Sequence, residues 1–298
     1  AQALLMRRSE RTLLLLCGML DDGLQPLSPA EYRTLALRVS QVKPSEGSLS
    51  EEFLRALGYQ AAAAERIAAL VERQAALDVF LARAASRGVT VLTRLSEQFP
   101  ERLRRLGNRC PAVLFCMGDP ALLRRPCVSL VGSRALRPEN RAFAERIGRL
   151  AAQEGLVLCS GGAAGADRAA QEACLSAGGS VVCFVPDELT RRAFDERVLY
   201  CSEDGWQCAF TAQRALRRNH CIHALGEKTF VAQCDLHRGG TWAGSEDNLR
   251  HRLSPVFIYN DGSPAAQALA QRGAELLNAA PASLAILQPN QLSIFDGI

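Results

Sequence analysis

Three short segments of this chain place glycine beside polar or charged residues, a combination that can bind phosphate. They are Gly132-Ser133-Arg134, SGGAAGAD at 160–167, and GGT at 239–241. Each precedes a stretch with the apolar spacing of a helix. Glycines leave backbone amides uncovered, and the first turn of a helix attracts anions. These segments therefore predict an anion-binding site.

The same glycines have a second interpretation, which the sequence leaves open. Glycine also allows a tight turn with positive φ, whether or not a ligand binds there. Asp167 is likewise favoured in a first helical turn by the helix dipole alone. With Arg218 and Asn219 of RRNHCIHAL added, the predicted phosphate-binding or DNA-binding residues are Gly132, Ser133, Arg134, Ser160, Gly161, Gly162, Gly165, Asp167, Arg218, Asn219, Gly239, Gly240 and Thr241.

A parallel sheet would bring these segments together. From residue 88 to 280, short apolar runs alternate with helical stretches. This predicts an α/β fold: a doubly wound, mostly parallel, Rossmann-like sheet with helices on both faces. Ligands of such sheets bind at the carboxyl ends of the strands. The predicted strands lie in VTVLT, AVLFCMG, CVSLVGS, LVLCS, SVVCFVP, KTFVAQ and SPVFIYN.

Two further regions flank this predicted domain. Residues 1–87 have helical spacing, as in AAAERIAALVERQAALDVFLARAAS, and predict a small all-α module similar to SAM or helix-hairpin domains. Residues 281–298 are polar and interrupted by proline, which predicts a flexible tail.

Charge and hydropathy are compatible with a nucleic-acid partner. The net charge is +4, and only Lys43 and Lys228 of the 35 basic residues are lysine. The planar fork of arginine suits phosphates and base edges, although an arginine-rich genome would explain the same composition. The apolar run LLLLCGML at 13–20 is too short to span a bilayer. We therefore expect a cytoplasmic protein with no membrane partner.

The spacing of cysteine, histidine and acidic residues gives little support for a metal site or a catalytic site. The eleven cysteines lie singly in apolar runs, and Cys201, Cys208, His220, Cys221 and His223 match no zinc template. We predict neither a metal nor a cofactor. Glu246 is the catalytic candidate, because it follows a glycine turn in a pattern similar to that of phosphoribohydrolases. No Ser-His-Asp grouping is legible, so the sequence favours a binding protein over an enzyme.

The order of the motifs resembles one known family. FPERLRRL, PAVLFCMGD, VSLVGSR, SGGAAGAD, RRNHCIHAL, GGTWAG and PVFIYNDGS follow one another as in the DNA-processing protein A (DprA or Smf) family. The resemblance implies an extended Rossmann fold that binds single-stranded DNA, forms a homodimer and loads a RecA-type recombinase. It implies a role in recombination, DNA uptake, repair or defence.

This sequence departs from the family pattern at several positions. Ala164 stands where arginine is common, Gln171 where histidine is frequent, and His220 where the RNR signature ends in arginine. GGTWAG also differs from the usual SGSLITA, which indicates a divergent branch. Asp187 ends the strand after the glycine turn, where a dinucleotide-binding fold has its ribose-binding acid. The alternative is therefore a nucleotide-sensing or nucleotide-hydrolysing Rossmann-like protein.

The C-terminal segment QLSIF resembles a short peptide by which bacterial DNA-metabolism proteins dock on the polymerase sliding clamp. Its anchors would be Gln291, Leu292, Ile294 and Phe295, carried on a proline-broken tether. A closing strand of the domain is the other interpretation of this segment.

Overall fold

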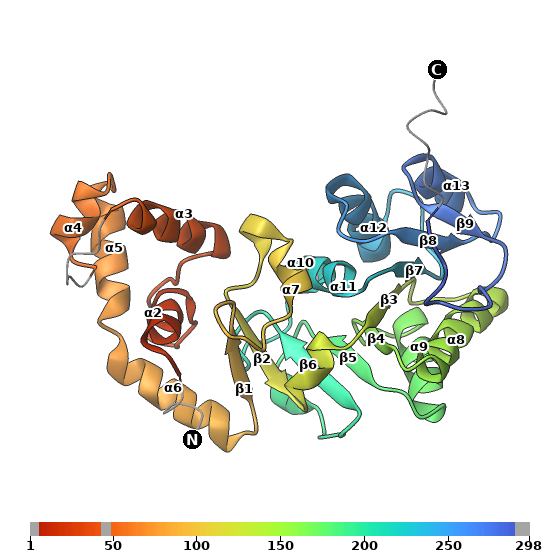
Figure 1. Ribbon diagram of the computed structural model, residues 1–298, viewed down its shortest axis with the longest axis horizontal. Coiled ribbons are helices and arrows are strands. Elements are labelled where there is room, and N and C mark those ends of the chain that lie inside the picture. Colours follow the sequence, from red (N-terminus) through yellow and green to blue (C-terminus); the bar gives the residue numbers. More distant parts are fainter. Residues whose placement is uncertain (1–5, 43–48, 290–298) are drawn as a thin grey trace.

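The N-terminal region is helical, as its spacing predicts. The computed structural model describes residues 6–42 and 49–289 (Figure 1). Serines start two of its helices: the Ser28 side chain accepts a hydrogen bond from the Glu31 amide, and Ser50 from the Phe53 amide. The helices are α2 (Arg8–Cys17), α3 (Pro29–Ser40), α4 (Glu51–Ala56), α5 (Ala61–Val71) and α6 (Gln74–Ser86).

Most of the remaining chain is organised around one sheet, which has nine strands within the described residues. Their spatial order is β1-β2-β6-β5-β4-β3-β7-β8-β9. Pairing is antiparallel for β1 with β2 and for β2 with β6, and parallel throughout the rest. The predicted mostly parallel, doubly wound sheet is thus confirmed. The strands are β1 (Thr90–Thr93), β2 (Val113–Met117), β3 (Cys127–Val131), β4 (Val157–Ser160), β5 (Val181–Phe184), β6 (Val198–Ser202), β7 (Thr229–Val231), β8 (Val256–Tyr259) and β9 (Glu275–Leu277).

Two of these strands were missing from the sequence prediction. β6 has the short run VLYCS and is buried because it lies between β5 and β2, which its own residues do not reveal. β9 is a three-residue edge strand whose side chains are all half-buried. β9 is too short to be recognised from its pattern, whereas the apolar run of β6 is as long as that of β4.

Helices cover both faces of the sheet (Figure 1). Successive residues of β3 point to opposite faces of the sheet. Leu130 belongs to the same hydrophobic cluster as Ile147 of α8, whereas Val131 belongs to a second cluster with Ile222 of α11. The helices of this domain are α7 (Glu101–Arg104), α8 (Pro138–Gln153), α9 (Ala166–Ser176), α10 (Ala212–Arg217), α11 (Asn219–Leu225), α12 (Gly239–His251) and α13 (Pro264–Gln271), with 3-10 turns η1 (Gly107–Arg109), η2 (Pro120–Arg124) and η3 (Leu189–Arg191).

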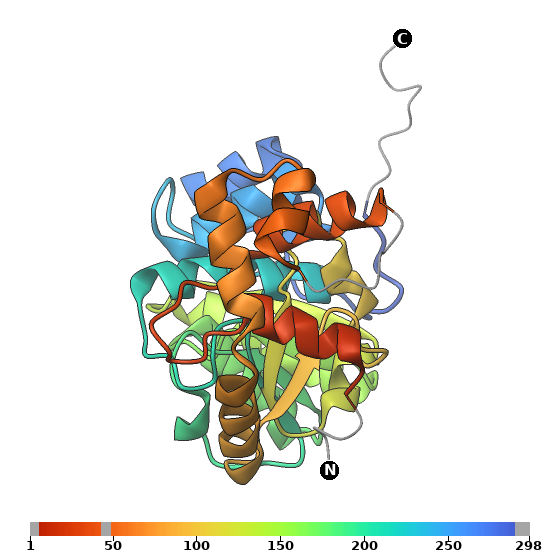
Figure 2. The ribbon, with the colours of Figure 1, turned by 90° about the vertical axis from the view of Figure 1, so that its left-hand side faces the viewer.

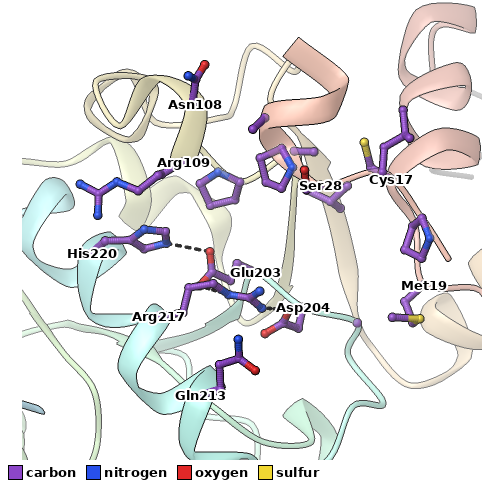
Figure 3. Close-up of a pocket in the computed structure, with 18 of the residues that line it drawn as sticks. Cys17, Met19, Ser28, Asn108, Arg109, Glu203, Asp204, Gln213, Arg217 and His220 are labelled. Carbon is purple, nitrogen blue, oxygen red and sulfur yellow. Dashed lines mark hydrogen bonds and ion pairs between the residues drawn. The ribbon is translucent and has the colours of Figure 1, made fainter. Parts of the chain in front are cut away.

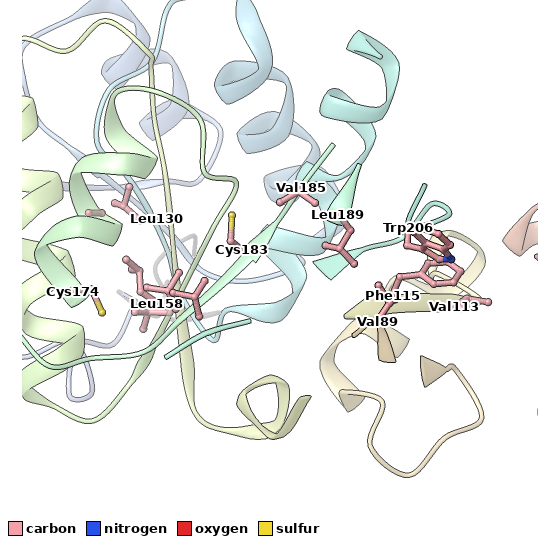
Figure 4. Packing of buried hydrophobic residues seen from close by; sticks show 14 of the residues in the cluster. Val89, Val113, Phe115, Leu130, Leu158, Cys174, Cys183, Val185, Leu189 and Trp206 are labelled. Atoms are coloured by element: carbon pink, nitrogen blue, oxygen red, sulfur yellow. The ribbon is translucent and has the colours of Figure 1, made fainter. Parts of the chain in front are cut away.

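The helical module packs on the β1–β2 end of the sheet (Figures 1 and 2). Phe80 of α6 meets the ring of Phe115 at 5.8 Å, edge to face, and that of Trp206 at 6.1 Å. Figure 4 shows Phe115 and Trp206 together at one end of a hydrophobic cluster that continues to Leu130 and Leu158. The module therefore shares its core with the sheet.

The packed domain extends beyond residue 280. Leu284 is fully buried, and the Glu154 carboxylate accepts hydrogen bonds from the amides of Leu284 and Ala285. The Lys228 ammonium donates to the carbonyls of the same two residues. Gln291, Leu292, Ile294 and Phe295 lie outside the described residues. Within residues 6–42 and 49–289, none of the helices combines the length and apolar character needed to cross a membrane.

Candidate nucleic-acid interface

A cleft of about 600 Å³ lies at the carboxyl ends of β3 and β7. The chain runs from β3 outward to β6 on one side and then crosses to β7 on the other, so this is the switch point of the sheet. We call it the glycine-turn cleft. Its lining includes most of the predicted binding residues: Gly132, Ser133, Arg134, Asp167, Arg218, Asn219, Gly239, Gly240 and Thr241.

The loop after β3 is fixed by a residue that sequence reasoning missed. Gln233, two residues after β7, accepts hydrogen bonds at its backbone carbonyl from the Ser133 amide (3.0 Å) and hydroxyl (3.2 Å). Its side chain accepts from the Arg137 amide and donates to the Ala135 carbonyl. The position of Gln233 at the end of the predicted strand KTFVAQ could have indicated it as a site residue.

The SGGAAGAD loop packs against the same loop. Gly165 has φ of +86°, and a Cβ there would lie 2.3 Å from the carbonyl oxygen of Arg134. The Ala166 amide, at the start of α9, donates to the Ser133 carbonyl. Only glycine permits this approach of the two backbones.

Asp167 holds the loop closed from inside. One carboxylate oxygen accepts hydrogen bonds from the amides of Gly161 (3.2 Å) and Ala163 (3.3 Å). The Gly161 amide is thus occupied by Asp167. Ser160, Gly161, Gly162 and Gly165 do not line the cleft, and the fully buried Ser160 accepts a hydrogen bond from Gln171. These residues shape the loop.

Arg218 is also a buried element of this scaffold. Its guanidinium donates to the carbonyls of Gly161 (2.7 Å) and Phe184 (2.8 Å), and the residue is 8% exposed. Burial lowers the pKa of Arg218. Burial raises the pKa of Asp167 to about 6, against the opposing influence of Arg218 and the loop amides. The neighbouring Asn219 donates from its side-chain amide to the Gly240 carbonyl, at 3.3 Å, beside the start of α12.

The rim of the glycine-turn cleft carries cations without partners. Arg134 and Arg238 are exposed and line the cleft, and their guanidinium groups make no hydrogen bond or ion pair with any described residue. Phe210 (55% exposed) and Leu216 (54% exposed) provide an apolar wall. Arg238 precedes GGT directly in the sequence but was not predicted as a site residue.

The predicted catalytic and nucleotide-binding acids do not line this cleft. Glu246 of α12 forms ion pairs with Arg250 of the same helix (3.2 Å) and with Arg272, directly after α13 (3.6 Å). Asp187 pairs with Arg192. The acids among the described lining residues are instead Asp167 and Asp235.

A second cleft, of about 750 Å³, lies between the helical module and the sheet (Figure 3). We call it the interdomain cleft. Leu216 and Asn219 line both clefts. Arg109 pairs with Asp247 at 2.9 Å, and Arg217 pairs with Glu203 and Asp204. Among the described residues, Glu203, His220 and Cys221 are the group that could hold a metal ion.

Fold and cleft together define a Rossmann-like protein with a phosphate-compatible site at the switch point. The family model of DNA recombination-mediator protein A matches residues 90–288. The chain belongs to this family, and the resemblance inferred from its motifs is confirmed. No curated protein matches the chain at a significant level.

Two solved structures share the fold. DNA processing protein A (DprA) from Streptococcus pneumoniae matches 86% of this chain and 96% of its own, with a TM-score of 0.61 and 21% identity. DNA processing protein A from Helicobacter pylori, solved to show how it binds single-stranded DNA, matches 63% of this chain and 90% of its own, with a TM-score of 0.55 and 24% identity.

Proposed function

We propose that this chain binds single-stranded DNA in the glycine-turn cleft and acts as a DNA-processing protein in the cytoplasm. The observation that carries the proposal is the pair Arg134 and Arg238, both exposed on the rim of the cleft and unpaired within the described part of the chain. Arginines that are not neutralised by acids attract a phosphate backbone and release its counterions. Family membership supports the same function.

Each part of the cleft has a role in this proposal. Arg134 and Arg238 contact phosphates, and the first amides of α12, which have no side-chain cap, add hydrogen bonds to a neighbouring phosphate. Phe210 provides a face on which a base can stack. Arg218 and Asp167 act indirectly, by holding the loops that present these groups. No bond is made or broken.

Three partner interactions extend the proposal. Self-association as a homodimer and loading of a RecA-type recombinase rest on the family resemblance alone. Docking on the sliding clamp rests on Gln291, Leu292, Ile294 and Phe295. Removal of residues 290–298 should abolish clamp binding in a pull-down with purified clamp. Unchanged binding would contradict the docking proposal.

The DNA proposal is tested by fluorescence anisotropy of a labelled single-stranded oligonucleotide over a series of salt concentrations. Arg134→Ala and Arg238→Ala should each reduce the slope of log affinity against log salt by about 0.7, the value for one phosphate contact on a single strand.

The matched control is Arg149→Ala, an exposed arginine on α8 outside the cleft. It should leave the slope unchanged. Absence of binding at low salt, or equal effects of all three substitutions, would overturn the proposal. Competition by a free nucleoside monophosphate as strong as that by the oligonucleotide would favour a nucleotide ligand instead.

A further inference from the structure

Three side chains of different chemistry converge at the floor of the interdomain cleft. Glu203 directly follows β6, while His220 and Cys221 lie in the first turn of α11. The His220 Nε2 atom is 2.8 Å from Oε2 of Glu203, and the Cys221 Sγ atom is 3.8 Å from the same oxygen. All three potential ligand atoms lie within 4.8 Å of one another. Figure 3 shows Glu203 and His220 facing each other in the cleft.

The donor set suits a borderline divalent cation. Imidazole nitrogen, thiolate sulfur and a carboxylate oxygen are the three ligand types that Zn²⁺ uses in proteins. The side chains of Glu203 and His220 are 8% and 7% exposed, and Cys221 is fully buried. Packing therefore holds all three in place. A mobile surface cluster would not be fixed in this way.

The local hydrogen bonds leave Glu203 incompletely satisfied. Its Oε1 atom is buried and accepts no hydrogen bond from a described residue, although Nε of Arg217 lies 3.5 Å away. Arg217 approaches this oxygen and also pairs with Asp204, whereas Oε2 faces His220 and Cys221. The two oxygens thus face different groups, and Oε2 is the one available to a cation.

One side of this group is open. Glu203 and His220 line the interdomain cleft, while Cys221 closes the site from the core. Three protein ligands with a fourth position toward a cleft is the arrangement of zinc sites that bind water or a further ligand. Structural zinc sites, by contrast, use four protein ligands.

We propose that Glu203, His220 and Cys221 bind one Zn²⁺ ion, with a fourth coordination position open to the interdomain cleft. The site is separate from the glycine-turn cleft and requires no DNA. Sequence spacing did not reveal it because Glu203 comes from the end of β6 and the other two ligands from α11.

The test uses the full chain, treated with a chelator and then titrated with Co²⁺ alone. We expect one equivalent to bind, with the thiolate-to-cobalt charge-transfer band of a cysteine ligand and the intense visible bands of tetrahedral Co²⁺. Zn²⁺ should then displace it stoichiometrically. Absence of the charge-transfer band in the wild-type protein overturns the proposal, whatever the variants do.

The variants are Cys221→Ser, Glu203→Gln and His220→Gln. Each should weaken Zn²⁺ binding by at least about 100-fold, since even the loss of outer contacts costs about 10–100-fold. Cys221→Ser should also remove the charge-transfer band. Circular dichroism of each variant verifies folding.

Two control variants each remove one thiol or one imidazole from outside the proposed site. Cys234→Ser removes a buried thiol outside this group, and His251→Gln removes an exposed imidazole. Both should bind the metal as the wild type does. Equal loss in Cys234→Ser and Cys221→Ser would contradict the assignment.

Discussion

The glycine-turn cleft and the interdomain cleft share a wall at Leu216 and Asn219 but treat their arginines in opposite ways. In the glycine-turn cleft, Arg134 and Arg238 are exposed and unpaired within the described chain. In the interdomain cleft, Arg109 and Arg217 are paired with acids. An arginine therefore indicates a phosphate site only where no acid neutralises it.

The same contrast applies to the turn between α10 and α11. Arg217 faces the interdomain cleft and Arg218 is bound beneath the glycine loop, although the two are adjacent in the sequence. From the sequence, only Arg218 is assigned to the predicted binding site. Their bonding partners show that the two arginines have different roles. Arg218 supports the glycine loop, whereas Arg217 pairs with acids in the interdomain cleft. The following predictions would break or sharpen this comparison.

The largest expected effect is that of Arg218→Ala. It leaves the carbonyls of Gly161 and Phe184 without their donor and removes the positive charge that most favours the ionised form of Asp167, so unfolding free energy should fall by about 3 kcal/mol. DNA affinity should fall with it, because the loop relaxes. Urea denaturation and anisotropy measure the two effects.

Arg214→Ala is the matched comparison for this variant. Arg214 is equally buried but bonds to Asp204, Cys208 and Ala209 on the interdomain side. It should lower stability and leave the DNA affinity of the folded protein unchanged. If Arg218→Ala behaved in the same way, the assignment of Arg218 to the glycine loop would fail.

A pH effect of nearly the same size should come from Asp167. Its pKa in the folded chain is raised from 3.8 to about 6, so the folded state binds this proton more tightly than the unfolded state. Its contribution therefore favours folding at low pH and is lost as pH rises from about 4 to 6, by about 3 kcal/mol in total. Asp167→Asn should remove this component, as urea denaturation at pH 4.5 and pH 7 will show. A stability difference between wild type and variant that stays constant with pH would refute it.

Gly165→Ala should have a smaller effect, about 2 kcal/mol, because the new methyl meets the backbone of Arg134 at 2.3 Å in a left-handed conformation. Gly239→Ala is the control within the same cleft. Gly239 also has positive φ, +84°, but a Cβ there has no neighbour within 4 Å. Equal losses in thermal melting would mean that only φ matters and that the approach of the two loops does not.

The smallest effect should come from Arg109→Ala. The pair of Arg109 with Asp247 is partly exposed, so its loss should cost less than about 1 kcal/mol. The salt dependence of DNA binding should stay that of the wild type, in contrast to Arg238→Ala. A reduced slope would show that DNA also contacts the interdomain cleft.

The sequence predicts the central strands because β3, β4, β5 and β7 are buried on both sides and read as continuous apolar runs. Helix α8 begins at Pro138, a residue type that suits the first helical position. The sequence does not predict that β2 pairs antiparallel with β6, because pairing direction depends on where the connections lead.

The site residues likewise fall into those that the local sequence indicates and those that only tertiary packing determines. The glycine motifs indicate where the cleft lies, since they follow predicted strands. Whether Arg218 faces solvent depends on how the α10–α11 turn inserts below the loop, and that contact is set by tertiary packing. Among the aromatic residues that could stack on a base, Trp206 and Trp242 are buried, whereas Phe210 is exposed. Residue type alone does not distinguish these three.

The close approach of the two loops has an evolutionary consequence. A Cβ at position 132 would lie 2.5 Å from the Cβ of Ala166, and one at 165 would meet the backbone of Ser133 and Arg134. No change of side chain at 133 or 134 could relieve the second contact, because backbone atoms make it. Across lineages of this family, we therefore expect glycine to be retained at both positions, so that the two loops are inherited as one fixed unit.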